Sequence, residues 1–128
     1  MIYGIGVDLC SIRRVQNIKD LNKFANKILT SAEIEYLGTL DQKNSVNYLA
    51  KQFAAKEALS KALGTGLTGD VKLNLIEIDR DQSGKPYIKM NDHMKTLLSK
   101  IGVNSTFVSL ADDSDFAVAT VILERWKK

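Results

Sequence analysis

The sequence predicts an α+β fold, in a single domain over residues 1–128, in which antiparallel strands pack against a long central helix. Three observations lead to this fold class. Hydrophobic residues alternate near the N-terminus, helical patterns fill most of the stretch from 11 to 63, and two hairpin patterns follow in the second half. Strands and helices are grouped along the chain and do not alternate regularly, which favours α+β over a parallel α/β sheet.

The first strand is predicted for residues 2–9, because these residues alternate between two faces. One face is apolar, and the other is mostly glycine and ends in an acid; the apolar face is Tyr3, Ile5, Val7 and Leu9, and the other is Ile2, Gly4, Gly6 and Asp8. Glycine in a strand permits a neighbouring backbone or a ligand to approach closely. Asp8 therefore ends the strand beside a place of close approach.

Helices and further strands follow. A helical segment, continuous or broken, is predicted for about 11–27, a second for 31–38 and the longest for about 44–63. Thr30 or Ser31 can cap the second helix, and Glu33 can close its capping box. A hairpin is predicted from 73–78 through 83–86 to 87–88, followed by a short helix at 92–101 and a last pair of strands at 105–111 and 116–124.

Composition limits the class of protein. Hydrophobic residues make up 45% and charged residues 26% of the chain, as in ordinary globular domains. The N-terminus lacks the pattern of a signal peptide, no apolar run has the length of a membrane span, and Cys10 is the single cysteine. We therefore expect a cytoplasmic protein without a membrane partner. A net charge of +3 is too small to require nucleic acid as a partner.

Basic residues are concentrated between positions 13 and 27. This segment has five basic residues and one acid, Asp20. Three of the lysines, Lys19, Lys23 and Lys27, are spaced by four residues, so on one helix they would share a face. A solvated helix face is the commoner meaning of such a pattern, and a docking surface for an acidic partner is the alternative.

The longest predicted helix places a carboxylate among apolar side chains. At 100° per residue, Glu57 falls near the middle of the apolar stripe formed by Val46, Leu49, Ala50, Phe53 and Ala54. A buried carboxylate is costly unless it is paired or binds a metal. Lys61, four residues further on, offers the simpler explanation of a helix salt bridge. Lys56 lies at the edge of the stripe, where we expect a solvated lysine.

Asp8 and Glu57 together suggest a magnesium site. Mg²⁺ typically takes one or two protein carboxylates and fills its other positions with water and substrate phosphate. An acid at the end of a strand and another inside a helix stripe are a suitable pair. The alternative for Asp8 is a charge at the N-terminus of the next helix, with Asp8 or Ser11 as its cap.

The segment Gly64-Thr65-Gly66-Leu67-Thr68-Gly69 formally matches the dinucleotide-binding pattern GxGxxG. That pattern must follow a strand and open a helix, whereas here it closes one. We interpret Gly64 as a helix C-cap before a loop whose backbone could approach a phosphate. His93, the only histidine, stands in a polar stretch and is expected at the surface.

Two segments carry a specific resemblance. MIYGIGVDLCSIRRV at 1–15 and FAAKEALSKALGTG at 53–66 closely resemble the signature segments of the holo-[acyl-carrier-protein] synthases, a small group of 4'-phosphopantetheinyl transferases. Segments 24–33, 84–86 and 108–124 also resemble the family, so the likeness covers the whole chain. It implies the 4'-phosphopantetheinyl transferase-like fold. It also implies an enzyme that moves the phosphopantetheine arm of coenzyme A to a serine of acyl carrier protein, using Mg²⁺ and releasing adenosine 3',5'-bisphosphate.

The resemblance also implies roles for individual residues. Asp8 and Glu57 would be the metal ligands, and either could serve as the base, Glu57 directly or Asp8 through a water. Lys61 would contact the pyrophosphate or the leaving phosphate and completes the catalytic set. The implied coenzyme A contacts are Lys61, Gly64, Thr65, Gly66, Lys85, Pro86 and Ser109. The implied contacts to the acidic carrier protein are Arg14, Lys23 and Lys27, which turns the basic segment from a solvated face into a docking surface.

Family members form trimers with active sites between neighbouring subunits, so a homotrimer is implied here. The chain departs from the family at Asp112, where many members have a histidine near the nucleotide, and an aspartate cannot supply a cationic contact there. Two other classes remain open: another two-carboxylate Mg²⁺-dependent phosphotransfer enzyme, and a basic binding module for an acidic protein or nucleic acid. Mg²⁺-dependent binding of coenzyme A would separate an enzyme from a binding module.

Overall fold

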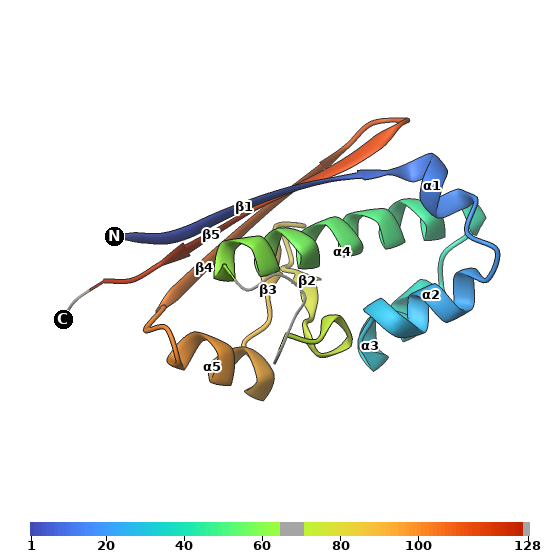
Figure 1. The fold of residues 1–128 in the computed structure, drawn as a ribbon. Helices are drawn as coiled ribbons and strands as arrows, with labels where there is room; N and C mark the ends of the chain where they lie inside the picture. The colour runs from blue at the N-terminus through green and yellow to red at the C-terminus, as the bar shows by residue number, and fades with distance from the viewer. Residues whose placement is uncertain (65–70, 127–128) are drawn as a thin grey trace.

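A computed structural model describes residues 1–64 and 71–126 and confirms the α+β class. Within these residues a long helix crosses one face of a three-stranded sheet, and the shorter helices gather around the same side (Figure 1). The elements are β1 (Ile2–Ser11), α1 (Ile12–Gln16), α2 (Leu21–Ile28), α3 (Ser31–Leu37), α4 (Gln42–Leu63), the 3₁₀ turn η1 (Leu73–Leu75), β2 (Ile78–Arg80), β3 (Pro86–Ile88), α5 (Asp92–Ser99), β4 (Ser105–Asp112) and β5 (Phe116–Glu124).

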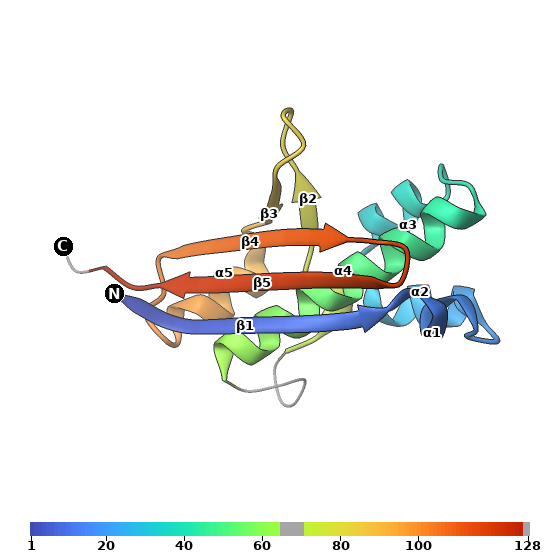
Figure 2. The same cartoon turned by 90° about the horizontal axis from the view of Figure 1, so that it is seen from above.

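The main sheet has the order β1-β5-β4, with both neighbouring pairs antiparallel. Its register places Asp8 of β1 beside Ala119 of β5, and Ala119 beside Leu110 of β4. A separate hairpin of β2 and β3 projects beyond the β4 edge, away from β1 (Figure 2). Asp8 and the hairpin therefore lie toward opposite edges of the main sheet.

The glycines of β1 allow α4 to lie directly against the sheet. A Cβ atom on Gly4 would stand 2.0 Å from the Ala62 carbonyl oxygen, and one on Gly6 would stand 1.8 Å from the Ala58 carbonyl oxygen. No side chain fits in such a gap, so glycine is required at both positions. The close approach expected at these glycines is thus to a backbone, that of α4.

The opposite face of β1 is apolar and exposed. Ile5, Val7 and Leu9 keep 57%, 52% and 61% of their surface accessible, and Phe107 on β4 keeps 52%. The core lies on the α4 side, where Ala117, Ala119, Val121 and Leu123 of β5 are fully buried. The sheet therefore has one face packed on the core and one apolar face that nothing in the described chain covers.

The predicted helices are confirmed with two refinements. The segment predicted for 11–27 is broken into α1, which Ser11 caps, and α2, which Asp20 caps. Lys19 falls in the break, so the expectation that it shares a helix face with Lys23 and Lys27 is wrong. The predicted capping box is present, because Thr30 accepts from the Glu33 N–H and the Glu33 carboxylate accepts from the Thr30 N–H.

The strand expected at 73–78 forms in part. Residues 73–75 make a 3₁₀ turn, and only the end of the segment pairs with β3. Because β3 is short, its pairing does not extend to Leu75. The Leu75 carbonyl oxygen accepts a hydrogen bond from the Asn91 side chain at 2.9 Å instead of one from a strand. Within the described ranges no helix is long and apolar enough to cross a membrane.

Candidate active site

Three of the residues singled out in the sequence meet at the seam between β1 and α4. The ammonium group of Lys61 donates to the Val7 carbonyl at 3.0 Å and to Asp8 Oδ1 at 3.1 Å. The Asp8 side chain is 16% exposed and the Lys61 side chain 53%, so the pair lies at the surface. Lys61 thus forms its ion pair with Asp8, and not with Glu57 as the helix spacing alone would suggest.

Glu57 lies next to this pair and is half-buried. Burial raises the pKa of its carboxyl, the Asp8 carboxylate raises it further, and Lys61 lowers it to a smaller extent. Two carboxylates that repel each other at a partly buried site can both stay ionised when a hard cation lies between them. Carboxylate oxygens are the ligands that Mg²⁺ prefers. In the described residues no group of three or more His, Cys, Asp or Glu side chains could hold a metal. Asp8 and Glu57 line the same cleft and carry the two carboxylates that an Mg²⁺ site completed by water and phosphate would use.

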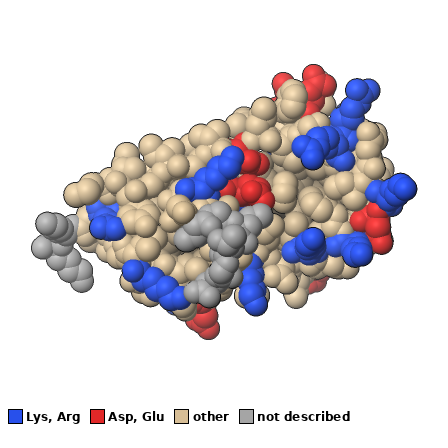
Figure 3. All heavy atoms as spheres, in the orientation of Figure 1, with Lys and Arg blue, Asp and Glu red and all other residues tan. Residues whose placement is uncertain are grey.

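A cleft of about 410 Å³ opens on this seam. Asp8 and Glu57 line it with Arg14, while Phe24 of α2 and Phe53 of α4 close its apolar side in an edge-to-face contact with centroids 5.4 Å apart. The space-filling view shows acidic and basic side chains meeting near the middle of this face, with further basic side chains over the end formed by α1 and α2 (Figure 3). The cleft therefore joins the acidic pair to the basic segment.

The predicted carrier contacts lie at this end of the molecule. Arg14, Lys23 and Lys27 are all exposed. Asp20 Oδ1 accepts from the Lys23 backbone N–H at 3.0 Å, so the one acid of the segment is used as a helix cap. The lysine side chains of α2 therefore extend from a helix that forms one wall of the cleft.

The main error of the sequence interpretation is the expectation that Lys56 is solvated. Lys56 is fully buried and not solvated, because its ammonium donates to Glu33 Oε1 at 2.5 Å and to the Ile28 and Leu73 carbonyl oxygens at 2.6 and 3.1 Å. Burial lowers the pKa of Lys56, and the Glu33 carboxylate opposes that shift. The clue in the sequence was only that the opposite face of this helix is also apolar, at Ala55, Ala58, Leu59 and Ala62.

The remaining predicted coenzyme A contacts are distributed over several elements. Gly64 caps α4 in the left-handed conformation with φ of 83°, as expected, and Thr65 and Gly66 lie outside the described residues. Lys85 and Pro86 are on the β2–β3 hairpin. Ser109 is exposed on β4. Among the described residues, the remaining predicted contacts therefore come from the end of α4, the β2–β3 hairpin and β4.

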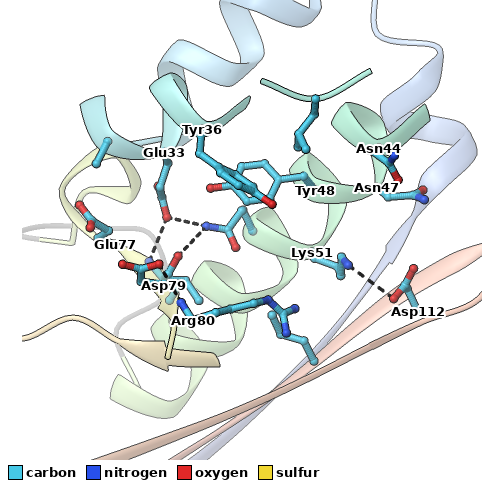
Figure 4. Close-up of a pocket in the computed structure, with 15 residues that line it drawn as sticks. Glu33, Tyr36, Asn44, Asn47, Tyr48, Lys51, Glu77, Asp79, Arg80 and Asp112 are labelled. Carbon is cyan, nitrogen blue, oxygen red and sulfur yellow. Dashed lines mark hydrogen bonds and ion pairs between the residues drawn. The ribbon is translucent and has the colours of Figure 1, made fainter. Parts of the chain in front are cut away.

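A second cleft, of about 930 Å³, lies on the β4 side of α4. The rings of Tyr36 and Tyr48 contact each other there at a tilt of 58°, with centroids 5.0 Å apart, and Arg80 projects toward the cleft from β2 (Figure 4). Asp112 forms an ion pair with Lys51 of α4 at 3.6 Å. As the sequence suggested, Asp112 provides no positive charge for a nucleotide. It does hold the Lys51 ammonium beside this cleft, which both residues line.

The fold and the acidic seam can be compared with known proteins. The model of the 4'-phosphopantetheinyl transferase superfamily matches residues 4–121. A Vibrio vulnificus holo-[acyl-carrier-protein] synthase is 42% identical over 125 residues, which cover 96% of this chain and 98% of that protein. The Bacillus subtilis synthase is 39% identical over 126 residues, 98% of both chains.

Solved structures show the same similarity to holo-[acyl-carrier-protein] synthases. The crystal structure of the Neisseria meningitidis holo-[acyl-carrier-protein] synthase superposes with a TM-score of 0.90 at 39% identity, covering 98% of this chain and 100% of that one. A Bacillus anthracis synthase, solved in complex with CoA (3',5'-ADP), gives 0.84 at 35% identity over 98% of this chain and 99% of that one. The protein is thus a member of the 4'-phosphopantetheinyl transferase superfamily. Within it, the chain belongs to the family of holo-[acyl-carrier-protein] synthases.

Proposed function

We propose that the protein transfers the 4'-phosphopantetheine arm of coenzyme A to a serine of apo acyl carrier protein in the cytoplasm. Adenosine 3',5'-bisphosphate is the other product. The observation that carries this proposal is the meeting of Asp8, Glu57 and Lys61 on one seam in a chain of this family. Two carboxylates beside a lysine suit phosphoryl transfer from a pyrophosphate to a hydroxyl group, because they offer both a metal site and a phosphate contact.

Asp8 and Glu57 would hold the Mg²⁺ ion. When bound, Mg²⁺ neutralises charge on the pyrophosphate and holds the two reactants in line. The ammonium of Lys61 is half exposed and reaches solvent from the same seam, so it can bind a pyrophosphate oxygen. Burial and the neighbouring Asp8 carboxylate raise the pKa of Glu57, and its carboxylate lines the cleft, where it could accept the serine proton.

In the transfer step, the serine oxygen of the carrier attacks the β-phosphorus of coenzyme A. The serine proton passes to the Glu57 carboxylate, and the bond between the β-phosphorus and the bridging oxygen breaks. The α-phosphate leaves as part of adenosine 3',5'-bisphosphate. Arg14 at the cleft and the lysines of α2 would steer the acidic carrier so that its serine enters beside Glu57.

We also propose a homotrimer in which coenzyme A lies between subunits. Two features support it. The exposed apolar face of the main sheet, which includes Ile5, Val7 and Leu9, is larger than scattered surface residues explain. Lys85 and Ser109 are on the β2–β3 hairpin and on β4, whereas Asp8 is on β1, so a neighbouring subunit could bring these residues to one coenzyme.

The experiment is incubation of the protein with apo acyl carrier protein, coenzyme A and Mg²⁺, followed by mass spectrometry of the carrier. We expect the mass gain of one phosphopantetheine arm, and no gain with chelator present. Glu57→Gln should abolish the gain while its circular dichroism spectrum stays that of the wild type. A fully active Gln variant would refute the role of Glu57, and an unmodified carrier with the wild type would refute the proposed reaction.

A further inference from the structure

The buried lysine that the proposed reaction does not use connects three separate parts of the chain to α4. The three donors of the Lys56 ammonium are taken by Ile28 at the end of α2, Glu33 of α3 and Leu73 of the 3₁₀ turn. Each partner comes from a different segment, and none is on α4. The ammonium is therefore a fully satisfied junction between these segments.

Glu33 completes this junction. One of its carboxylate oxygens accepts from Lys56 and from the Thr30 N–H at 2.9 Å. The other accepts from Gln52 Nε2 at 2.5 Å and from the Ile78 N–H at 2.9 Å, and these contacts line the floor of the larger cleft (Figure 4). Every acceptor site in the plane of the carboxylate is used, so the orientation of Glu33 is fixed.

The contact with Ile28 matters most for function. Ile28 is the last residue of α2, and the final carbonyl groups of a helix have no partner within it. A lysine ammonium is a favourable partner, because the C-terminus of a helix carries partial negative charge. Lys56 thus holds the end of the helix that carries Lys23 and Lys27 and supplies Phe24 to the cleft.

A buried ion pair is a poor means of gaining stability, because desolvation offsets much of the attraction and apolar residues would pack as well. Such a pair can instead fix the arrangement of the segments that it joins, because an ammonium group with three acceptors tolerates little displacement of any of them. Lys56 immediately precedes Glu57, so the same turn of α4 binds the end of α2 on one side and faces Asp8 on the other.

We propose that Lys56, oriented by Glu33, is a positioning residue for the carrier protein. It holds α2 against α4, so that the basic side chains of α2 stay at a fixed distance from Asp8 and Glu57. This inference rests on the proposed function. It assigns Lys56 no contact with coenzyme A, metal or carrier.

The test is the Lys56→Gln variant of the full-length protein, assayed for transfer at varied carrier concentration. We expect the carrier KM to rise on the order of tenfold, as for loss of a hydrogen bond to a charged group. Binding of coenzyme A with Mg²⁺ by calorimetry should stay within about twofold of the wild type. Amides of α2 should exchange faster with solvent, while those of α5 keep the wild-type rate.

The matched control is Met94→Ala. Met94 is fully buried in α5 and makes none of the hydrogen bonds of the Lys56–Glu33 junction, so truncating it destabilises the core while leaving that junction in place. It should leave the carrier KM unchanged. If Lys56→Gln does not fold, the double variant Lys56→Gln with Glu33→Gln leaves no unpaired buried charge and should show the same rise in carrier KM.

Any of several outcomes overturns the inference: Lys56 variants that behave as Met94→Ala, a fall in kcat with the carrier KM unchanged, or α2 exchange equal to the wild type. Inability of the double variant to fold also overturns it, because the pair would then be needed for folding itself. A wild-type protein that does not modify the carrier would instead refute the proposed function.

Discussion

Replacing Gly6 by alanine tests the packing that creates the acidic seam. The added Cβ would lie 1.8 Å from the Ala58 carbonyl oxygen and 2.8 Å from the Ala62 backbone nitrogen. An ordinary contact is 3.4 Å or longer, so β1 and α4 must separate by about 1.6 Å locally. Both obstacles are backbone atoms of a buried helix and cannot rotate away. We expect a loss of at least ~3 kcal/mol of unfolding free energy, the upper part of the range for overpacked cores.

The assay is thermal unfolding followed by circular dichroism, and the loss corresponds to a fall in Tm of roughly 10 °C. Transfer activity should fall as well, because Asp8 moves relative to Glu57 when the strand shifts. Gly38→Ala is the matched control: Gly38 is exposed at a helix end with φ of −63°, and its Cβ would meet nothing closer than 3.4 Å. A Gly6→Ala protein with the Tm and activity of the control would refute the placement of β1 on α4.

Further predictions concern the carrier, the trimer and a turn. Arg14→Ala should raise the apparent carrier KM, with strong salt dependence and little change for coenzyme A; an unchanged carrier KM would contradict the docking role. Val7→Lys on the exposed sheet face should yield smaller assemblies by analytical ultracentrifugation, and an unaltered mass would exclude this face as the interface. Hydrogen bonds from Ser83 and the Lys85 N–H lower the pKa of Asp81, so its carboxylate stabilises the β2–β3 turn at neutral pH and loses this effect as the pH falls through the folded-state pKa. An NMR titration of Asp81 at or above the ordinary pKa of 3.8 would contradict this contact.

The sequence was sufficient for features that depend on neighbours along the chain. The capping box of Thr30 and Glu33 spans three residues, and the helix end at Gly64 needs only a residue that tolerates positive φ. The glycines of β1 likewise marked this strand as one that something approaches closely, but they did not indicate that the partner is α4. In these cases one local pattern permits few alternatives.

Contacts between distant segments could not be predicted in this way. Lys56 was expected in solvent because its partner Glu33 lies 23 residues away, on a helix whose position relative to α4 no periodicity defines. The same holds for Lys51 and Asp112, which meet only because β4 runs beside α4. The 3₁₀ turn at 73–75 replaced an expected strand because β3 ends before it could pair with that segment. The two ion pairs and the 3₁₀ turn were therefore determined by the chain topology and not by the local conformational preferences of the residues.

The charges on α4 follow from its position between three different neighbours. Toward β1 the helix presents Glu57 and Lys61, toward α2 and α3 it presents Lys56, and toward β4 it presents Lys51. A surface helix needs only one apolar stripe, whereas a helix enclosed on several sides must pair each charge that it buries. The polar residues of α4 therefore indicate which surfaces it joins: the acidic seam with β1, the end of α2, and the larger cleft beside β4. If the proposed trimer forms and a neighbouring subunit supplies further coenzyme contacts, α4 would border two of its active sites.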